Sequence, residues 1–208
     1  MRFVLFCEGH TERKALPGFL KRWLDPKLSQ PVAVKVVRFD GWAELVKDAP
    51  VKAKLYLEGP GSADVLGVVG LLDLYGPTIY PGGVETPAER VEWLRKHVEK
   101  RVAQRRFRMF AAVHETEAWV LSQPDLLPRS VAGALPGKAA HPETVDFGEP
   151  PSRLLDRLYR DKTGGGYKKV VYGAALFAGL DPAVARAKCP YLAELLDDLL
   201  RMAKDAGL

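Results

Sequence analysis

The chain has 208 residues, of which 47% are hydrophobic and 27% charged, as in an ordinary globular domain. No apolar run approaches the ~20 residues that cross a bilayer, and the first residues lack the pattern of a secretory signal peptide. Its two cysteines exclude a disulfide framework and a cysteine-rich metal site. We therefore expect a cytoplasmic protein whose two cysteines are buried in the core.

The net charge of +5 weakly favours a polyanionic partner such as nucleic acid. Basic residues concentrate in two stretches, residues 95–108 and 157–169. Solvated helix faces or the surface chemistry of a thermophile would explain these stretches as well. In the first stretch we expect four arginines to contact a nucleic-acid backbone: Arg101, Arg105, Arg106 and Arg108.

The first quarter of the chain alternates two strand patterns with two helix patterns. The apolar run 2–7 predicts a strand that is buried on both faces. Apolar residues at helical spacing predict a helix over 12–24. The β-branched run 32–39 predicts a second strand, and a helix follows over 42–57 with a break near Pro50.

The same alternation continues in the second quarter. A third strand is expected over 65–72, ending on an aspartate. Residues 86–105 predict a long helix, because Thr86 and Glu89 have the spacing of a capping box, with proline at the first helical position. A fourth strand is expected over 107–115, and another helix begins directly after it.

The last part of the chain shows only helical patterns. Residues 128–151 are rich in proline, glycine and alanine, which predicts a long loop or small excursion. Helices are expected over 151–160, 168–177 and 189–204.

These elements predict an α/β fold with a mainly parallel sheet of about four strands, flanked by helices, and a helical C-terminal region. We divide the chain into an α/β core, residues 1–125, and a loop and helical region, residues 126–208. The second part is expected to pack on the first as one continuous domain.

Acidic residues follow three of the four predicted strands: Glu8 with Glu12, then Asp73, then Glu115 with Glu117. The carboxyl ends of parallel strands meet at one edge of a sheet, where ligands bind. Clustered carboxylates raise each other's pKa unless a cation neutralises them. An all-oxygen site favours Mg²⁺ or Mn²⁺.

Each acid taken singly has another explanation. Glu12 is placed to stabilise the start of a helix, and Asp73 is a common residue before a turn. The metal prediction therefore depends on the acids converging in space.

The motif "CEGHTE" after the first strand resembles the Glu-Gly-x-x-Glu turn of the Toprim fold, found in topoisomerases, bacterial primases and OLD-type phage-defence nucleases. The whole chain is similar to a bacterial Toprim-like family described only as a domain of unknown function, DUF4276. The motifs that carry this similarity are "EGHTE", "HETEAW" and a late "YKK…CP" segment.

The resemblance implies that Glu8, Glu12 and Asp73 bind one or two metal ions. It also implies a later acid and a lysine, for which the candidates are Glu115, Glu117, Lys168 and Lys169. The sequence departs from the family pattern at Tyr75, which stands where a second aspartate is expected. Tyrosine is a poor ligand for a hard cation at neutral pH.

Three functions are consistent with these residues. The leading one is a Toprim-type nuclease dependent on Mg²⁺ or Mn²⁺, with Glu8, Lys168 and Lys169 as catalytic residues; it would act as a phage-defence effector beside an ATPase partner. The second is a catalytically degenerate module that binds nucleic acid or the ATPase and regulates it, which Tyr75 favours. The third is a metal phosphohydrolase of small nucleotides. The sequence leaves open DNA or RNA, and monomer or homodimer.

Overall fold

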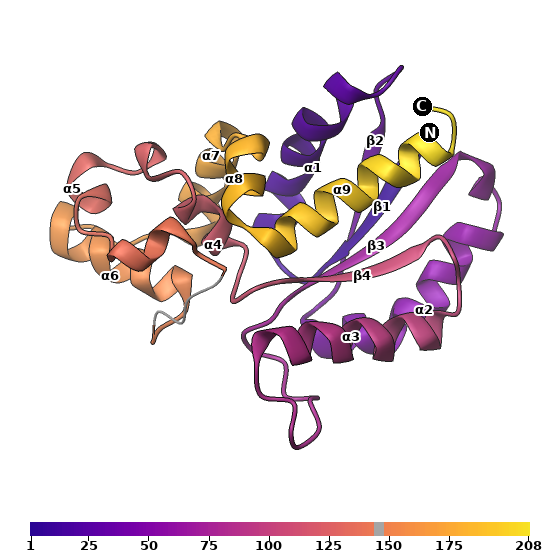
Figure 1. Cartoon of the computed structure of the whole chain (residues 1–208), viewed down its shortest axis with the longest axis horizontal. Helices are drawn as coiled ribbons and strands as arrows, with labels where there is room; N and C mark the ends of the chain where they lie inside the picture. Colours follow the sequence, from indigo (N-terminus) through magenta and orange to yellow (C-terminus); the bar gives the residue numbers. More distant parts are fainter. Residues whose placement is uncertain (144–147) are drawn as a thin grey trace.

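The computed structural model describes residues 1–143 and 148–208. A four-stranded sheet runs through the centre of the molecule, in the spatial order β2-β1-β3-β4 (Figure 1). Its strands are β1 (Arg2–Cys7), β2 (Ala33–Arg38), β3 (Val65–Asp73) and β4 (Phe107–Ala112). All three strand pairs are parallel, which confirms the predicted α/β class and the parallel sheet of four strands.

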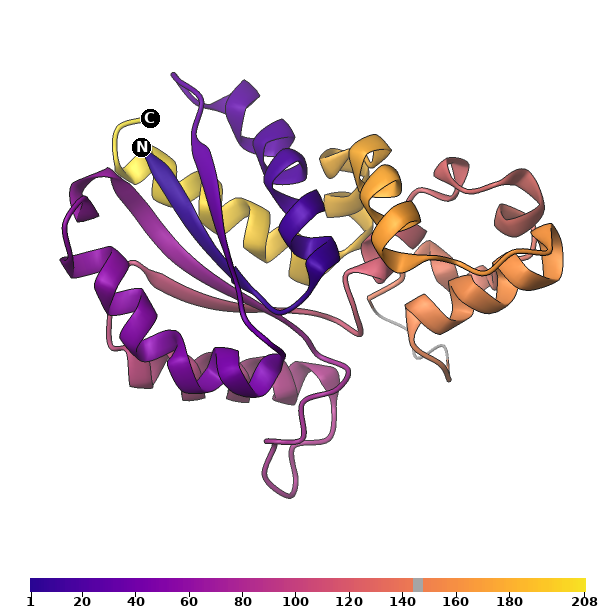
Figure 2. The same cartoon turned by 180° about the vertical axis from the view of Figure 1, so that it is seen from behind.

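Long helices cover both faces of the sheet (Figures 1 and 2). They are α1 (His10–Leu24) and α9 (Pro190–Asp205) on one face, and α2 (Trp42–Glu58) and α3 (Pro87–Val102) on the other. Strand β1 is buried on both sides, as predicted. Phe3 and Leu5 pack in the core under α1 and α9, and Val4 and Phe6 pack under α2 and α3.

Helix α2 continues through Pro50, so the predicted break is wrong. Proline has no N–H to donate to the carbonyl four residues earlier, which is that of Val46. The guanidinium of Arg101, from α3, donates to this carbonyl oxygen at 3.0 Å. The helix therefore stays intact because a neighbouring helix supplies the missing donor.

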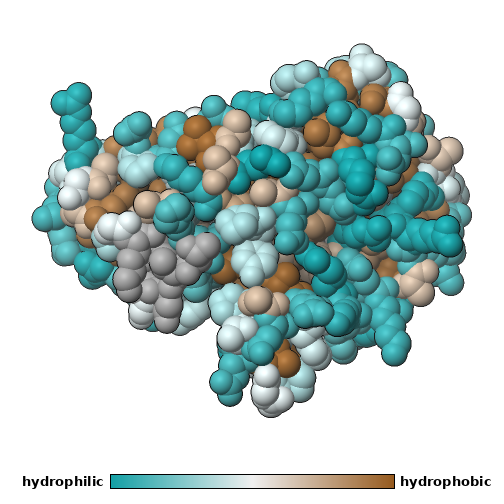
Figure 3. Space-filling view, viewed as in Figure 1, coloured by the Kyte–Doolittle hydropathy of each residue, from teal (hydrophilic) through white to brown (hydrophobic). Residues whose placement is uncertain are grey.

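The predicted start of α3 is confirmed. The hydroxyl of Thr86 accepts from the backbone N–H of Glu89, and the Glu89 carboxylate accepts from the backbone N–H of Thr86. At its other end, α3 reaches the amino ends of the strands. The face over α9 and α3 is largely hydrophilic, with hydrophobic residues in small separate patches (Figure 3).

A group of shorter helices lies beyond the carboxyl ends of the strands (Figure 1). These are α4 (Glu117–Leu121), α5 (Arg129–Ala132), α6 (Pro151–Thr163), α7 (Ala174–Gly179) and α8 (Pro182–Lys188). Short 3₁₀ turns occur at Asp25–Lys27, Ser62–Asp64, Pro124–Leu126 and Gly137–Ala140. The core on the α1 side contains residues from both halves of the chain, such as Phe19 and Leu192.

The structure of this region differs from the sequence prediction in three places. The expected loop 128–151 contains short helical turns, and its residues 144–147 lie outside the described residues. The expected helix 168–177 is instead one wide π-helical turn, Lys169–Gly173, followed by α7. Helix α8 was not predicted.

Both cysteines are buried and unpaired, as expected. In the described part of the chain, no helix has the length and apolar character to cross a bilayer.

Candidate functional site

Acidic side chains from β1 and β3 meet at the carboxyl edge of the sheet. Glu8 directly follows β1, and Asp73 is the last residue of β3. Glu8 Oε1 accepts a hydrogen bond of 3.2 Å from the backbone N–H of Asp73. The two strands are neighbours in the parallel sheet, so this convergence follows from the topology, as the sequence predicted.

The turn between β1 and α1 brings Glu12 back to the same edge. Its carboxylate lies over Gly9, where a Cβ atom would stand 1.6 Å from Glu12 Oε2. The backbone of Gly9 is extended, with φ −96° and ψ 158°, a conformation open to any residue. Glycine at this position of the Glu-Gly-x-x-Glu motif therefore leaves room for the carboxylate of the second glutamate, which a side chain would displace.

A threonine that the sequence analysis missed joins these acids. Thr116 is 1% exposed. Its backbone N–H donates to Asp73 Oδ1 at 3.2 Å, and its hydroxyl donates to Glu12 Oε1 at 3.2 Å. The only signal in the sequence was a small hydroxyl residue between Glu115 and Glu117.

The second of the two candidate lysines enters the cluster. Lys169 begins the π-helical turn, and its ammonium lies 2.9 Å from Glu117 Oε2 and 3.9 Å from Asp73 Oδ2. Lys168, its neighbour, is exposed. The irregular backbone turns only one of the two adjacent side chains inward, so the structure separates candidates that the sequence could not.

Two carboxylates in this cluster are almost completely buried. Glu117 is 0% exposed and Glu12 is 5% exposed. Within the described part of the chain, Glu117 Oε1 and Glu12 Oε2 have no hydrogen-bond partner. Burying such oxygens without a partner is costly. Glu8, Glu12, Asp73 and Lys169 line a shared cavity of about 290 Å³ beside them.

Burial changes the acid–base properties of the cluster. Burial raises the pKa of Glu8, and the charge of Glu12 adds to this effect. Burial likewise raises the pKa values of Asp73 and Glu117, while the Lys169 ammonium opposes that rise. For Lys169, burial acts to lower the pKa, but the carboxylates of Glu117 and Asp73 outweigh it and raise the pKa. The acids are thus poorly neutralised by one lysine.

Two residues near the cluster take other roles. Glu115 Oε2 accepts from the backbone N–H of Ser152 at 2.9 Å, which ties the strand end to the start of α6. Tyr75 is 54% exposed, and its backbone N–H donates to the carbonyl oxygen of His114 at 3.0 Å. Of the five predicted acids, four lie around Thr116 and Lys169. Glu115 lies near enough for its charge to raise the pKa values of Asp73, Glu117 and Lys169.

The four arginines predicted to contact nucleic acid do not flank this cluster. Arg106 donates to the carbonyl oxygens of Val65 at 2.6 Å and Leu57 at 2.8 Å. Val65 begins β3 and Asp73 ends it, eight residues or ~26 Å further along the strand. Arg101 is held by the α2 carbonyl freed by Pro50.

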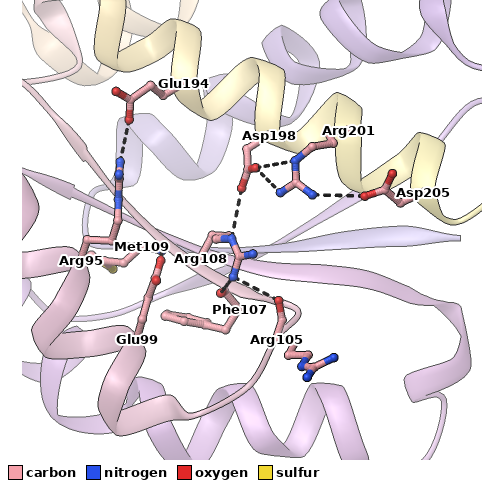
Figure 4. A network of polar contacts seen from close by, with 10 residues as sticks. All are labelled: Arg95, Glu99, Arg105, Phe107, Arg108, Met109, Glu194, Asp198, Arg201 and Asp205. Carbon is pink, nitrogen blue, oxygen red and sulfur yellow. Dashed lines mark hydrogen bonds and ion pairs between the residues drawn. The ribbon is translucent and has the colours of Figure 1, made fainter.

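The other two arginines lie at the same distant end (Figure 4). Arg108 pairs with Asp198 of α9 at 3.4 Å, in a network that continues to Arg201. The side chain of Arg105 points away from this network. Only its backbone carbonyl takes part, accepting from Arg108 at 3.1 Å. These arginines mainly join elements of the fold at the amino ends of the strands.

Known structures provide a distant likeness in overall fold. The C-terminal region of the Burkholderia pseudomallei OLD protein is 19% identical, with a TM-score of 0.47 over 98% of this chain and 97% of that one. The C-terminal region of the Xanthomonas campestris pv. campestris OLD protein is also 19% identical, with a TM-score of 0.43 over 99% of this chain and 95% of that one.

None of the curated proteins is similar enough in sequence to match the chain. A family does match, and its description reads "Domain of unknown function (DUF4276)". The match extends over residues 7–200 and so includes Glu8, Thr116 and Lys169. The protein therefore belongs to the DUF4276 family.

Proposed function

We propose that this protein hydrolyses phosphodiester bonds in nucleic acid with the help of a divalent metal ion. One observation carries the proposal. Glu12 and Glu117, both almost completely buried, each keep a carboxylate oxygen without a hydrogen-bond partner in the described structure. Glu12 lines a cavity together with Glu8, Asp73 and Lys169, and Glu117 is ion-paired with that lysine.

The donor set suits a hard cation. All the candidate ligand atoms are carboxylate oxygens, which Mg²⁺ and Mn²⁺ prefer. Among residues 1–143 and 148–208, however, no three acids, histidines or cysteines are already arranged to hold an ion. Lys169 lies among them instead. Glu8, Glu12 and Asp73 are the residues that would hold the ion, with Glu117 beside them; once bound, it would activate water and offset charge on the phosphate.

The chain's own groups suit an incoming phosphate. Helix α1 begins next to the cavity, and no side chain among residues 1–143 and 148–208 caps its first N–H groups. Such a helix start favours anions. The Lys169 ammonium, 3.9 Å from Asp73 Oδ2, adds a positive charge within the same cavity. Both features supply favourable interactions where negative charge develops during hydrolysis.

Three exposed cations near these elements support a nucleic-acid substrate. Arg13 and Lys14 follow Glu12 in the first turn of α1, and Lys168 precedes Lys169. None of them forms an ion pair within the part of the chain that the structure describes. Unpaired surface cations of this kind bind phosphate backbones without reading sequence. We assign backbone contact to these residues in place of the four distant arginines.

The second candidate is a regulatory module that binds nucleic acid or a partner ATPase without cleaving it. Tyr75 favours this function because its exposed side chain replaces a second aspartate. The ATPase partner and a role in phage defence come from the sequence resemblance alone and stay predictions, as does a homodimer.

Cleavage of single- and double-stranded DNA and RNA by the purified chain, with Mn²⁺, Mg²⁺ or a chelator, tests the proposal. Asp73→Asn keeps an acceptor for the Thr116 N–H but removes one charge. We expect metal-dependent cleavage by the parent and a loss of at least ~100-fold in this variant. Lys54→Gln, an exposed change on α2, is the control. Binding of nucleic acid without cleavage would favour the regulatory module. Cleavage in the presence of chelator would contradict the proposed dependence on a metal ion.

A further inference from the structure

Lys169 is the cation that the structure places among the buried acids. Its Nζ lies 2.9 Å from Glu117 Oε2 and 3.9 Å from Asp73 Oδ2. Asp73 is the last residue of β3 and Glu117 is the first residue of α4, and burial raises the pKa of both carboxyl groups. In the metal-free protein, the ammonium therefore holds together carboxylates that would otherwise repel each other.

The neutralisation that Lys169 provides is incomplete. Only one oxygen of Glu117 contacts the ammonium, and the other, Oε1, is buried without a partner among the described residues. Glu12 Oε2 is likewise buried without a hydrogen-bond partner among the described residues. One positive charge thus faces four carboxylates, counting Glu8, and Glu115 adds a further negative charge nearby. The cluster has the charge and the unused acceptor atoms for a cation of higher valence.

A divalent cation that bound these carboxylates would compete with the ammonium for them, because like charges a few ångström apart in a partly buried site repel strongly. The side chain of Lys169 can leave the cluster toward solvent. Its side chain is 35% exposed, and its long unbranched stem can turn toward solvent while the main chain stays in place. The Thr11 hydroxyl of α1 donates a long hydrogen bond of 3.5 Å to the Lys169 carbonyl oxygen.

We propose that Lys169 is a resident counter-ion, which occupies the acid cluster in the metal-free protein and is displaced toward solvent by a divalent cation. This inference rests on the proposed function, since it concerns the same cluster. Displacement couples metal loading to substrate binding, because it makes the ammonium available to a phosphate only after the ion is in place.

The exchange can be tested on the unmodified protein through the reactivity of its amines. Acylation of Lys169 and Lys168 is measured by site-resolved mass spectrometry, with and without Mn²⁺. An ammonium paired with carboxylates holds its proton and reacts slowly, so we expect Mn²⁺ to raise the acylation rate of Lys169 by at least about tenfold relative to exposed Lys168. An unchanged or reduced relative rate at saturating Mn²⁺ would overturn the exchange.

A second measurement compares Lys169→Met with Lys168→Met, which removes the charge of the adjacent exposed lysine. If Lys169 competes with the ion, Lys169→Met should bind Mn²⁺ about tenfold more tightly than the parent by titration calorimetry, and it should unfold at lower temperature without Mn²⁺. Lys168→Met should match the parent in its affinity for Mn²⁺ and in its unfolding temperature. Equal or weaker Mn²⁺ binding by Lys169→Met, with parent binding intact, would overturn the exchange alone. Mn²⁺ binding by none of the three proteins would overturn the proposed function with it.

Discussion

The carboxylate of Glu12 occupies the space where a side chain at Gly9 would lie, with Oε2 at 1.6 Å from the position of a Cβ atom. Because the Glu12 carboxylate is the end of a side chain, Gly9→Ala should displace it and spare the fold. Loss of its hydrogen bond to Thr116 should cost ~1 kcal/mol, whereas the stabilisation by Mn²⁺ should be largely lost. Thermal unfolding with and without Mn²⁺ measures both effects.

The matched control for this change is Gly82→Ala, because no atom lies within 4 Å of a Cβ at Gly82 and its φ is not positive. This variant should keep the full Mn²⁺ effect. A Gly9→Ala protein that also keeps it would show that the position of the Glu12 carboxylate does not matter for metal binding.

Glu8→Gln should abolish metal-dependent cleavage while the fold stays intact. Glutamine keeps an oxygen that can accept from the Asp73 N–H, but it lacks the charge that holds a hard cation. Without metal, the variant should be at least as stable as the parent, because burial makes the charged form of Glu8 unfavourable and raises its pKa. Earlier melting of the metal-free variant would mark Glu8 as structural and favour the regulatory module.

The same pair of proteins should differ in pH dependence. Since the pKa of Glu8 is higher in the fold than in the unfolded chain, where it is ~4, the fold favours its protonated form. The contribution of Glu8 to the free energy of unfolding is therefore fully present below pH ~4 and is lost as pH rises through the raised pKa. The stability of Glu8→Gln relative to the parent should increase with pH, by up to ~1.4 kcal/mol for each pH unit that separates the folded and unfolded pKa values.

Denaturant unfolding between pH 4 and 8 in chelator measures this difference, in which the contributions of titrating groups distant from Glu8 cancel. A relative stability of the variant that falls with pH would mean that the fold favours charged Glu8. Saturating Mn²⁺ should favour the parent increasingly at higher pH, because the ion binds the carboxylate form.

Arg106 and Lys14 should behave in opposite ways when each is changed to glutamine. Arg106 bonds to carbonyl oxygens of α2 and β3, so its loss should cost ~2 kcal/mol or more of stability. Lys14 is exposed and free of ion pairs in the described chain, so its loss should spare stability and weaken nucleic-acid binding. The slope of log affinity against log salt should decrease by about 1 for Lys14→Gln. Equal salt slopes in both variants would contradict the assignment of the binding face.

The sequence predicted the convergence of acids because it follows from one rule. Glu8 and Asp73 stand at the ends of parallel neighbouring strands, and the sheet places such ends together whatever the details of packing. The role of Thr116 in the cluster could not be predicted, because a threonine near the start of a helix is usually a helix cap. Its position under Glu12 depends on how α4 follows β4.

Other features could not be predicted because they depend on contacts between distant segments. A proline inside a helix pattern indicates a break, and only the approach of α3 lets Arg101 compensate for Pro50. Likewise, a regular helix from Lys168 onward would place the two lysines about 100° apart on its surface. The π-helical turn at Lys169 decides which one reaches Glu117, and no local propensity specifies such a turn.

The cluster draws on chain segments that begin at Glu8 and extend to Lys169, so its contacts close most of the chain into a single loop. Contacts of such long sequence separation form late in folding, after the loop entropy has been overcome by the sheet and its helices. Neither the first half of the chain nor the last can assemble the carboxylates with their lysine. A nascent chain would therefore carry no complete cluster until the segment that contains Lys169 had been synthesised and had packed at the carboxyl edge of the sheet.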